Sequence, residues 1–203
     1  MLKISSRHRK KFKGFFSSPE TIMHFVYMKC RFSLSYHDLE EMMSMRGASV
    51  DHATLQRWVV KFVPLIEKTM RKRKKSTGNS WRMDETYIKL NGKWIYLYRA
   101  VDSMGNTIDF LLRARRNKPA AKAFFKKAIK HNGRREKTAI DKSGSNISAL
   151  KDLNEGVPKE QKIEVRQNKY LNNLVEQDHR FIKKRVKPML GFKNFYSAKT
   201  TIA

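Results

Sequence analysis

Three acidic residues in the second half of the sequence have the types and positions that metal-assisted phosphoryl transfer requires. Asp84 lies in an expected strand, where aspartate is disfavoured unless solvent, a partner or a metal compensates it. Asp141 follows the apolar run "TAI" at the carboxyl end of another expected strand, and Glu176 lies on an expected helix. Carboxylates are ligands that Mg²⁺ prefers, and a pair of such ions can activate the attacking oxygen and stabilise the leaving oxygen of a phosphodiester. We therefore predict that these three acids are catalytic ligands of Mg²⁺ or Mn²⁺, with a pair of ions bound.

The segment "KYLNNLVEQDHRFIKKR", residues 169 to 185, contains two acids that helical periodicity separates. At about 100° per residue, Glu176 falls on the polar face of the expected helix. Its companions on that face are Asn172, His179 and Lys183. Asp178 falls instead within the expected buried stripe, and we predict a structural contact for it, for instance with Arg185. The apolar members of that stripe are Leu171, Leu174, Val175, Ile182 and Val186.

Two neighbouring assignments stay open in the sequence. Glu85 follows Asp84 directly, so it points to the opposite face of the expected strand. Asp141 is followed by the small-residue loop "DKSGSN", which allows a substrate to approach. The same position also suits a residue that caps the next helix.

The elements that must position these acids are strands and helices that follow one another from Trp81 onward. Runs rich in aromatic and branched residues predict three antiparallel strands, the first two joined at Asn91 and Gly92. Helix, strand, helix, strand and a long helix follow, and the order βββαβαβα is the ribonuclease H-like arrangement, an α/β fold with a mixed sheet and flanking helices. In that fold the first strand lies beside the fourth, so Asp84 and Asp141 are expected to meet. We expect strands at 81–90, 93–102, 106–114, 137–141 and 162–167, and helices at 119–133, 145–154 and 169–185.

The residues before this region predict a small all-α domain. After a basic arm at residues 7–13, helices are expected from Pro19, after Ser35 and near Asp51. A short helix, a turn at Gly47 and a helix with a polar outer face form the pattern of a helix-turn-helix, whose second helix enters the major groove. The apolar side of that helix consists of Leu55, Trp58, Val59 and Phe62. Its predicted DNA contacts are His52, Thr54, Gln56, Arg57 and Lys61.

A basic run, "RKRKK" at residues 71–75, precedes the flexible stretch "STGNS" and marks the expected domain boundary. We predict a DNA-binding domain at 1–75 and a catalytic core at 76–203. Arg71, Lys72 and Arg73 are expected to contact DNA phosphates, although the run also fits a solvated linker.

The charge of the chain indicates a polyanionic partner. Its 45 lysines and arginines against 18 acids give a formal net charge of +27, and the release of counterions from nucleic acid favours binding by such a chain. A ribosomal or histone-like binder and an enzyme acting on nucleic acid both fit this charge. The single cysteine, Cys30, excludes an internal disulfide and a cysteine-based zinc site. Without a signal peptide or a membrane-spanning apolar run, we expect a cytoplasmic, nucleoid-associated protein.

Over nearly its whole length the sequence resembles the DDE transposases of compact bacterial insertion sequences, specifically the IS-six type. The likeness is carried by "WRMDETYIKLNGKWIYLYRAVDSMGNTIDFLL", "DKSGSN", "YLNNLVEQDHRFIKKR", "SYHDLEEMM" and "GASVDHATLQRW". The spacing from Asp141 to Glu176 and the basic residue Lys183 are typical of this group. By this resemblance the catalytic triad is Asp84, Asp141 and Glu176. Lys183 and His179 are then expected to contact DNA.

The same resemblance implies a transposase that binds the terminal inverted repeats of its element. It implies the use of Mg²⁺ to free a 3′-hydroxyl and join it to target DNA, without a covalent protein–DNA intermediate, in a homodimer or higher multimer. Family members continue beyond the position of Ala203 with a further helix. Two alternatives stay open: a truncated, non-catalytic repressor that binds the element's ends, and a ribonuclease H-like nuclease that uses the same acids.

Overall fold

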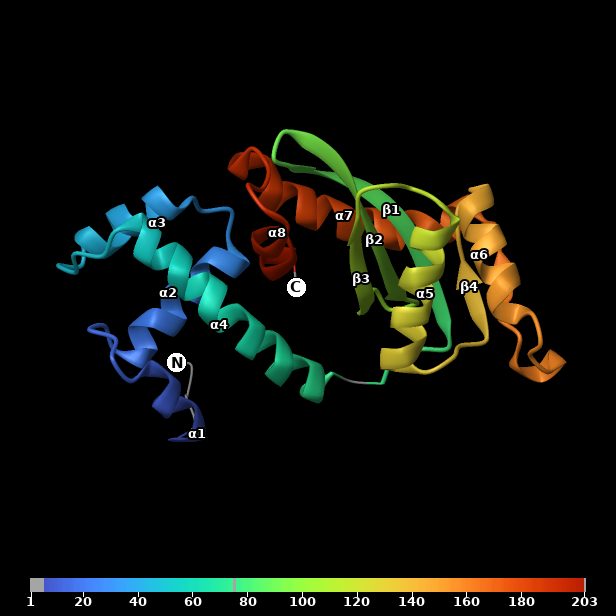
Figure 1. Ribbon diagram of the computed structural model, residues 1–203, viewed down its shortest axis with the longest axis horizontal. Helices are drawn as coiled ribbons and strands as arrows, with labels where there is room; N and C mark the ends of the chain where they lie inside the picture. The colour runs from blue at the N-terminus through green and yellow to red at the C-terminus, as the bar shows by residue number, and fades with distance from the viewer. Residues whose placement is uncertain (1–5, 75, 203) are drawn as a thin grey trace. The chain divides into compact units, whose positions relative to one another are not determined.

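The computed structural model describes residues 6–74 and 76–202, without the side chains of residues 7, 70–73 and 169. The chain forms two compact units (Figure 1). One comprises Met1–Lys74 with Lys184–Ala203, and the other comprises Lys75–Lys183. The residues from Lys184 onward thus group with the N-terminal helices, which a division of the sequence at a single point did not anticipate.

Side-chain caps start the main helices of the first unit, as the sequence predicted. Ser18 accepts a hydrogen bond from a backbone N–H of the first turn of α2, and Ser35 forms a capping box with Asp38 at the start of α3. Asp51 caps α4 in the same way. Across the described residues of the whole chain, each helix is too short or too polar to span a lipid bilayer. The elements of this unit are α1 (Ser6–Arg9), η1 (Lys10–Phe12), α2 (Pro19–Arg31), α3 (Tyr36–Ser44), α4 (His52–Arg73), η4 (Lys187–Met189) and α8 (Phe195–Ile202).

The helices of this unit pack around the apolar side of α4. Leu55, Trp58, Val59 and Phe62 are all buried, as predicted. Phe12, from the segment predicted as a basic arm, is buried too, and its ring stacks on that of Phe62 with centroids 4.4 Å apart. The arm therefore contains an aromatic anchor that packs into the helical core.

The second unit is built on a five-stranded sheet with the strand order β3-β2-β1-β4-β5. β1 pairs antiparallel with β2 and parallel with β4, while β2–β3 is antiparallel and β4–β5 is parallel. This order confirms the expected ribonuclease H-like arrangement, with the first strand beside the fourth. The elements are β1 (Ser80–Leu90), β2 (Lys93–Asp102), β3 (Thr107–Arg113), α5 (Lys118–Asn132), β4 (Lys137–Ala139), α6 (Gly144–Asn154), η2 (Lys159–Gln161), β5 (Glu164–Arg166), η3 (Lys169–Asn172) and α7 (Asn173–Val186).

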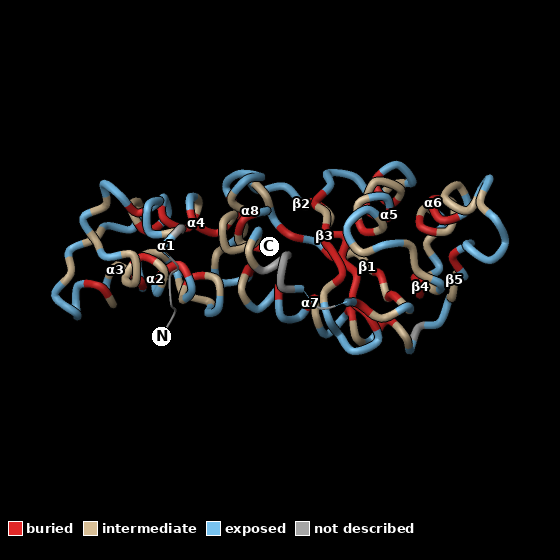
Figure 2. The backbone as a smooth tube through the Cα atoms, turned by 90° about the horizontal axis from the view of Figure 1, so that it is seen from below, coloured by how far each residue is buried: buried red, intermediate tan, exposed pale blue. Residues whose placement is uncertain are grey.

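The register of β1 is set by its hairpin with β2. Asn91 and Gly92 have φ angles of 46° and 75°, the left-handed pair that suits a two-residue turn between twisted strands. The pleat then sends alternate residues of β1 to opposite faces of the sheet. On one face, Trp81 and Met83 lie in the apolar core that the sheet forms with α5 and α6. Figure 2 shows α7 on the opposite face.

Candidate active site

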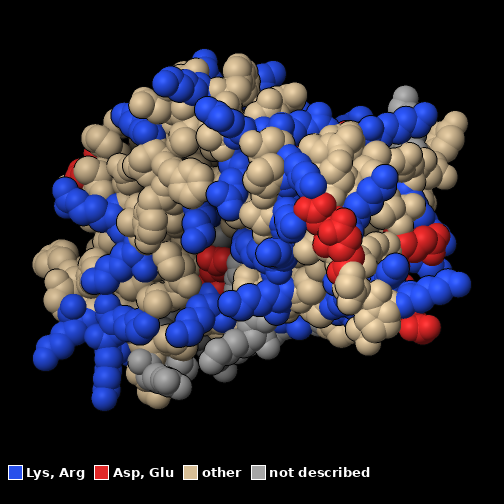
Figure 3. Space-filling model, turned by 45° about the vertical axis from the view of Figure 1, so that its right-hand side comes forward, with Lys and Arg blue, Asp and Glu red and all other residues tan. Residues whose placement is uncertain are grey.

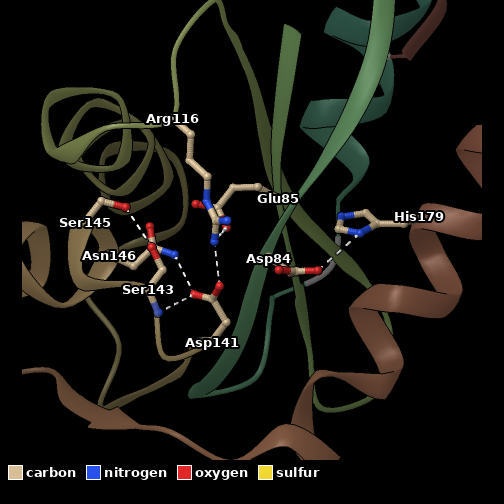
Figure 4. A network of polar contacts seen from close by, with 8 residues as sticks. All are labelled: Asp84, Glu85, Arg116, Asp141, Ser143, Ser145, Asn146 and His179. Atoms are coloured by element: carbon tan, nitrogen blue, oxygen red, sulfur yellow. Dashed lines mark hydrogen bonds and ion pairs between the residues drawn. The ribbon is translucent and has the colours of Figure 1, made fainter. Parts of the chain in front are cut away.

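Asp84 and Asp141 come together where β4 ends beside β1. The parallel pairing of these strands stops at Arg82 and Ala139, so β1 continues beyond the end of β4. Asp84 lies just past the part of β1 that pairs with β4, and Asp141 lies just past the end of β4. One oxygen from each, together with one from Glu85, lies within 4.8 Å of the others (Figure 4). The structure thus brings the two acids together, as predicted from the topology.

Glu85 is a member of this group that the sequence analysis missed. Strand alternation directs it to the face opposite that of Asp84, as predicted, yet its carboxylate reaches the same group beyond the end of β4. Its side chain is only 2% exposed. The signal for its role was an acid on the core-facing side of a strand, next to Met83, where a carboxylate requires a cationic partner.

Arg116, in the loop between β3 and α5, is that cationic partner. Its Nη2 atom lies 2.5 Å from Asp141 Oδ2 and 3.3 Å from Glu85 Oε2. Burial raises the pKa of Glu85, and the Arg116 charge opposes that shift. For Arg116 itself, burial acts to lower the pKa, but Glu85 and Asp141 outweigh it and the net shift is upward. One guanidinium nitrogen therefore joins carboxylates from two strands.

The other oxygen of Asp141 organises the start of α6. Oδ1 accepts hydrogen bonds from the Ser143 backbone N–H and the Asn146 side-chain amide, both at 3.1 Å. These bonds match the alternative interpretation of Asp141 as a cap for the following helix. They leave Oδ2 to the contact with Arg116, so one side chain both holds the loop and joins the acidic group through its cationic partner.

Among the three acids of this group, Asp84 has the most strongly shifted pKa. Burial is the largest cause, and the charges of Asp141 and Glu176 add to it, so that its pKa is raised to about 6. The influence of Glu176 means that α7 brings this acid into the electrostatic neighbourhood of Asp84. Glu176 is not among the acids whose oxygens lie within 4.8 Å of one another. A carboxyl group perturbed in this way is typical of functional sites.

The buried side of α7 differs from the stripe predicted for it. Leu171 and Leu174 are only partly buried, whereas Asn172 and His179, predicted to share the exposed face of Glu176, are buried. The prediction weighed only apolar residues, but this part of the helix packs on the end of the sheet that carries acids. The buried positions, which recur at helical spacing through η3 and α7, are Asn172, Val175, His179, Ile182 and Val186.

His179 is buried in the structure, whereas the sequence analysis placed it on an exposed face; its contact with DNA stays a prediction. Its side chain is 6% exposed, and its Nδ1 atom lies 3.5 Å from Asp84 Oδ2. Burial lowers its pKa to about 4, so the imidazole is neutral at pH 7. Lys183, one of its former companions, is exposed, and its contact with DNA stays a prediction.

Asp178 makes the structural contact predicted for it, but with a different partner. Arg99 of β2, and not Arg185, donates hydrogen bonds to both carboxylate oxygens of Asp178. The same guanidinium donates to the Thr107 hydroxyl at 2.8 Å. Because Arg99 belongs to a distant strand, inspection of the helix alone could only suggest a partner nearby in sequence.

The predicted DNA-reading side of α4 is largely exposed, and some of its side chains already have partners. Gln56 and Arg57 are exposed. The Thr54 hydroxyl donates to Asp51 at 2.9 Å, and the Lys61 ammonium lies 4.4 Å from the centroid of an aromatic ring. Three predicted phosphate contacts have side chains outside the described part of the structure: Arg71, Lys72 and Arg73.

His52 belongs to a second group of possible metal ligands. Its Nδ1 atom lies 3.0 Å from Glu40 Oε2, which lies 3.5 Å from His37 Nδ1. The three donor atoms lie within 4.8 Å of one another, and their side chains are 37% to 75% exposed. This group lies in the helical unit, where the imidazoles already have a carboxylate partner.

Basic side chains are spread over much of the face seen in Figure 3, and acidic side chains occur there in small groups. This distribution agrees with the formal net charge of +27. The acids within β1 and just past the end of β4 therefore belong to a minority of acidic residues in a basic chain. Their oxygen donors suit a hard divalent cation, and Glu85 Oε1, which is buried without a hydrogen-bond partner among the described residues, indicates capacity for a further cationic group.

Comparisons with known proteins agree with this arrangement. The family model described as a DDE domain matches residues 78–203, and that of the transposase IS66 family matches residues 14–134. The transposase for insertion sequence-like element IS431mec of Staphylococcus aureus is 40% identical over 172 residues, which are 85% of this chain and 75% of the relative. The transposase for element IS257 in transposon Tn4003, also from Staphylococcus aureus, has the same identity and coverage.

Among solved structures, the catalytic core domain of BIV integrase has a TM-score of 0.45 at 15% identity, over 61% of this chain and 79% of that chain. The strand order within the sheet, and not this likeness, establishes the fold. The family models and the sequence relatives together establish the family. The chain belongs to the DDE transposases of bacterial insertion sequences, which are polynucleotidyl transferases that use a divalent metal ion.

Proposed function

We propose that Asp84, Asp141 and Glu176 hold a pair of Mg²⁺ or Mn²⁺ ions at which this transposase cuts and joins DNA. The meeting of Asp84, within β1, and Asp141, just past the end of β4, with Glu176 near enough to raise the Asp84 pKa, carries the proposal. When bound, such ions supply activation of the attacking oxygen and stabilisation of the leaving oxygen. Three carboxylates provide the oxygen donors and the negative charge that hard cations require.

Side chains around the three acids prepare them for this role. Asp84, with a pKa of about 6, is ionised for most of the time at pH 7 to 8, so it can donate to a cation. His179 beside it is neutral in that range and adds no competing positive charge. Ser143 and Asn146 fix the orientation of Asp141 through one oxygen only. The other oxygen of Asp141 pairs with Arg116.

The proposed reaction has two phosphoryl transfers. Water first attacks the phosphodiester at the end of the element, the bond from phosphorus to the bridging 3′ oxygen breaks, and a 3′-hydroxyl is released. That hydroxyl then attacks a phosphodiester of the target, forming a new strand junction while the target's own 3′ oxygen leaves. Both steps exchange one P–O bond for another and need no covalent protein–DNA intermediate.

We further propose that α4 reads the terminal inverted repeats. Exposure of Gln56 and Arg57 supports their insertion into the major groove, where arginine and glutamine can form paired hydrogen bonds with base edges. Exposed cations such as Lys183 on α7 are suited to phosphate contacts near the acids. An element has two ends, so two or more copies of the chain are proposed to act together, and the charge of +27 supports association with the nucleoid.

The proposal is tested by incubating the protein with Mg²⁺ and a labelled duplex that carries the element's end. We expect nicking at the 3′ end of the element and joining to a second DNA, with both products lost in Asp84→Asn. Glu40→Gln, which alters a carboxylate of the exposed group in the helical unit, is the matched control and should retain both products. Nicking that persists in Asp84→Asn would contradict the assignment of Asp84 as a catalytic metal ligand.

A further inference from the structure

Glu85 and Arg116 lie among the active-site acids but have no part in the proposed triad. The Glu85 side chain is 2% exposed; its Oε2 atom contacts the Arg116 Nη2 atom, and by hydrogen-bond geometry its Oε1 atom has no partner among the described residues. A carboxylate that is buried with one oxygen unsatisfied costs free energy, so its retention in this position requires an explanation.

Arg116 contacts the Asp141 oxygen that would otherwise be available to a metal ion. Its Nη2 atom is 2.5 Å from Asp141 Oδ2, the oxygen not used by Ser143 and Asn146. A guanidinium is always charged and carries only donors, so it competes directly with a metal cation for a carboxylate oxygen. The Arg116 side chain is 33% exposed and comes from a loop, which gives it room to change partners.

Glu85 has an acceptor free for that change. The planar fork of arginine forms its strongest contact by donating to both oxygens of one carboxylate. In the present arrangement Arg116 uses one nitrogen for two different carboxylates, and Glu85 Oε1 has no hydrogen-bond partner among the described residues. The Asn146 amide donates to Asp141 Oδ1, and it also lies close enough to Glu85 to act on that carboxyl as a hydrogen-bond donor that lowers its pKa.

We propose that Arg116 is a positioning residue that holds Asp141 while no metal is bound and moves fully onto Glu85 when a divalent cation binds. Glu85 is then the receiving site for the displaced guanidinium, not a metal ligand of the triad. The inference rests on the proposed function, in which Asp84 and Asp141 hold the cation. The exchange keeps the buried carboxylates compensated in both states, because one positive group replaces another.

The test measures Mn²⁺ affinity of the full chain without DNA, from the electron paramagnetic resonance signal of free Mn²⁺. Arg116→Ala removes the competitor and should tighten Mn²⁺ binding about tenfold, as removal of one nearby positive charge allows. Glu85→Gln leaves Arg116 on Asp141 and should weaken Mn²⁺ binding about tenfold, the scale found for residues that support metal ligands. The two variants thus shift the affinity in opposite directions, which a merely structural pair would not do.

Arg115→Ala is the matched control, because it removes the same charge from the neighbouring, exposed position. It should change the Mn²⁺ affinity by less than about twofold. Arg116→Lys keeps the charge but lacks the fork, so its affinity should lie between those of the wild type and Arg116→Ala. If Arg116→Ala is unfolded at the temperature of the assay, the affinity of Arg116→Lys tests the inference in its place.

The outcomes separate this inference from the proposed function. If Asp141→Asn leaves Mn²⁺ affinity unchanged, the proposed metal site fails and the inference fails with it. If Asp141→Asn abolishes binding while Arg116→Ala and Arg116→Lys bind Mn²⁺ no more tightly than the wild type, only the role of Arg116 is overturned. Opposite shifts for Arg116→Ala and Glu85→Gln, with Arg115→Ala unchanged, support it.

Discussion

Two groups of possible metal ligands occur in the described part of the chain, and their surroundings differ. Each offers three donor atoms within 4.8 Å of one another. In the helical unit, the side chains of His37, Glu40 and His52 are 75%, 37% and 50% exposed. In the sheet unit, Glu85 is 2% exposed, and by hydrogen-bond geometry its Oε1 atom has no partner within the described residues.

The comparison shows that closeness of ligand atoms does not by itself identify a site. Water can solvate an exposed carboxylate and two imidazoles, so their proximity has little energetic consequence. At the end of the sheet, burial and like charge raise the pKa of Asp84 to about 6, and an arginine is held between two acids. Buried charge that remains incompletely compensated is the feature that separates the second group from the first.

The largest expected difference is in catalysis. Asp141→Asn should reduce 3′-end cleavage by about 10³-fold or more, because it removes a ligand of the proposed metal site. Glu40→Gln should leave the cleavage rate within about twofold, since it alters only an exposed pair. Rates are measured with a labelled element end at saturating Mg²⁺. Comparable losses in both variants would remove the distinction between the two groups.

The next difference is in stability. Asp178→Ala leaves Arg99 buried without its carboxylate and should lower the free energy of unfolding by about 3 kcal/mol. The exposed Glu40→Ala should lower it by less than about 1 kcal/mol. Denaturant titrations followed by circular dichroism measure both. If Asp178→Ala is as stable as Glu40→Ala, the buried ion pair contributes no more to stability than the exposed carboxylate.

A third prediction concerns the pH dependence of stability without metal. The pKa of Asp84 in the folded chain is about 6, above its ordinary 3.8, so between these values the folded state retains a proton that the unfolded chain has lost. Stability from this residue is therefore present at low pH and is lost as the pH rises through about 6. Asp84→Asn should be more stable than the wild type by about 2 kcal/mol at pH 7. Near pH 4 the two proteins should be equally stable in EDTA.

The wild type, measured in the same buffers from pH 4 to pH 7, is the reference for this measurement. A pH-independent effect of Asp84→Asn would mean that the substitution acts through packing and not through the charge of the carboxylate.

The smallest expected effect is in DNA recognition by the helical unit. Arg57→Ala should reduce the discrimination between the element's end and random DNA by about 1 kcal/mol, the lower end for a base contact. Lys61→Ala, on the same helix and packed on a ring, is the comparison for phosphate binding. Competition binding at fixed salt measures both. If Arg57→Ala weakens both DNAs equally, its contact is with phosphate alone.

Much of the fold could be predicted because its signals are local. Ser35, Asp38 and Gly92 fix a helix start and a hairpin turn by their own chemistry. The order of strands and helices then identified the topology, and with it the meeting of Asp84 and Asp141. These conclusions required no knowledge of which distant side chains touch.

The misses all depend on contacts between distant segments. Arg99 reaches Asp178 from another strand, and Arg116 reaches Glu85 and Asp141 from a loop. Helical phase placed His179 on the exposed face of Glu176, yet it is buried beside an acid. Periodicity gives the angle of a residue around a helix, but what lies opposite that angle decides whether a polar residue is buried.

The ion pair between Arg99 and Asp178 also determines how the third acid is held. Glu176 and Asp178 share one rigid helix, so a strand next to that of Asp84 sets both the depth and the rotation of Glu176. A slide or roll of α7 that moved Glu176 away would have to break this pair. Amide hydrogen exchange in α7 should therefore report on active-site geometry: loss of protection there would signal a displaced carboxylate before any DNA is added.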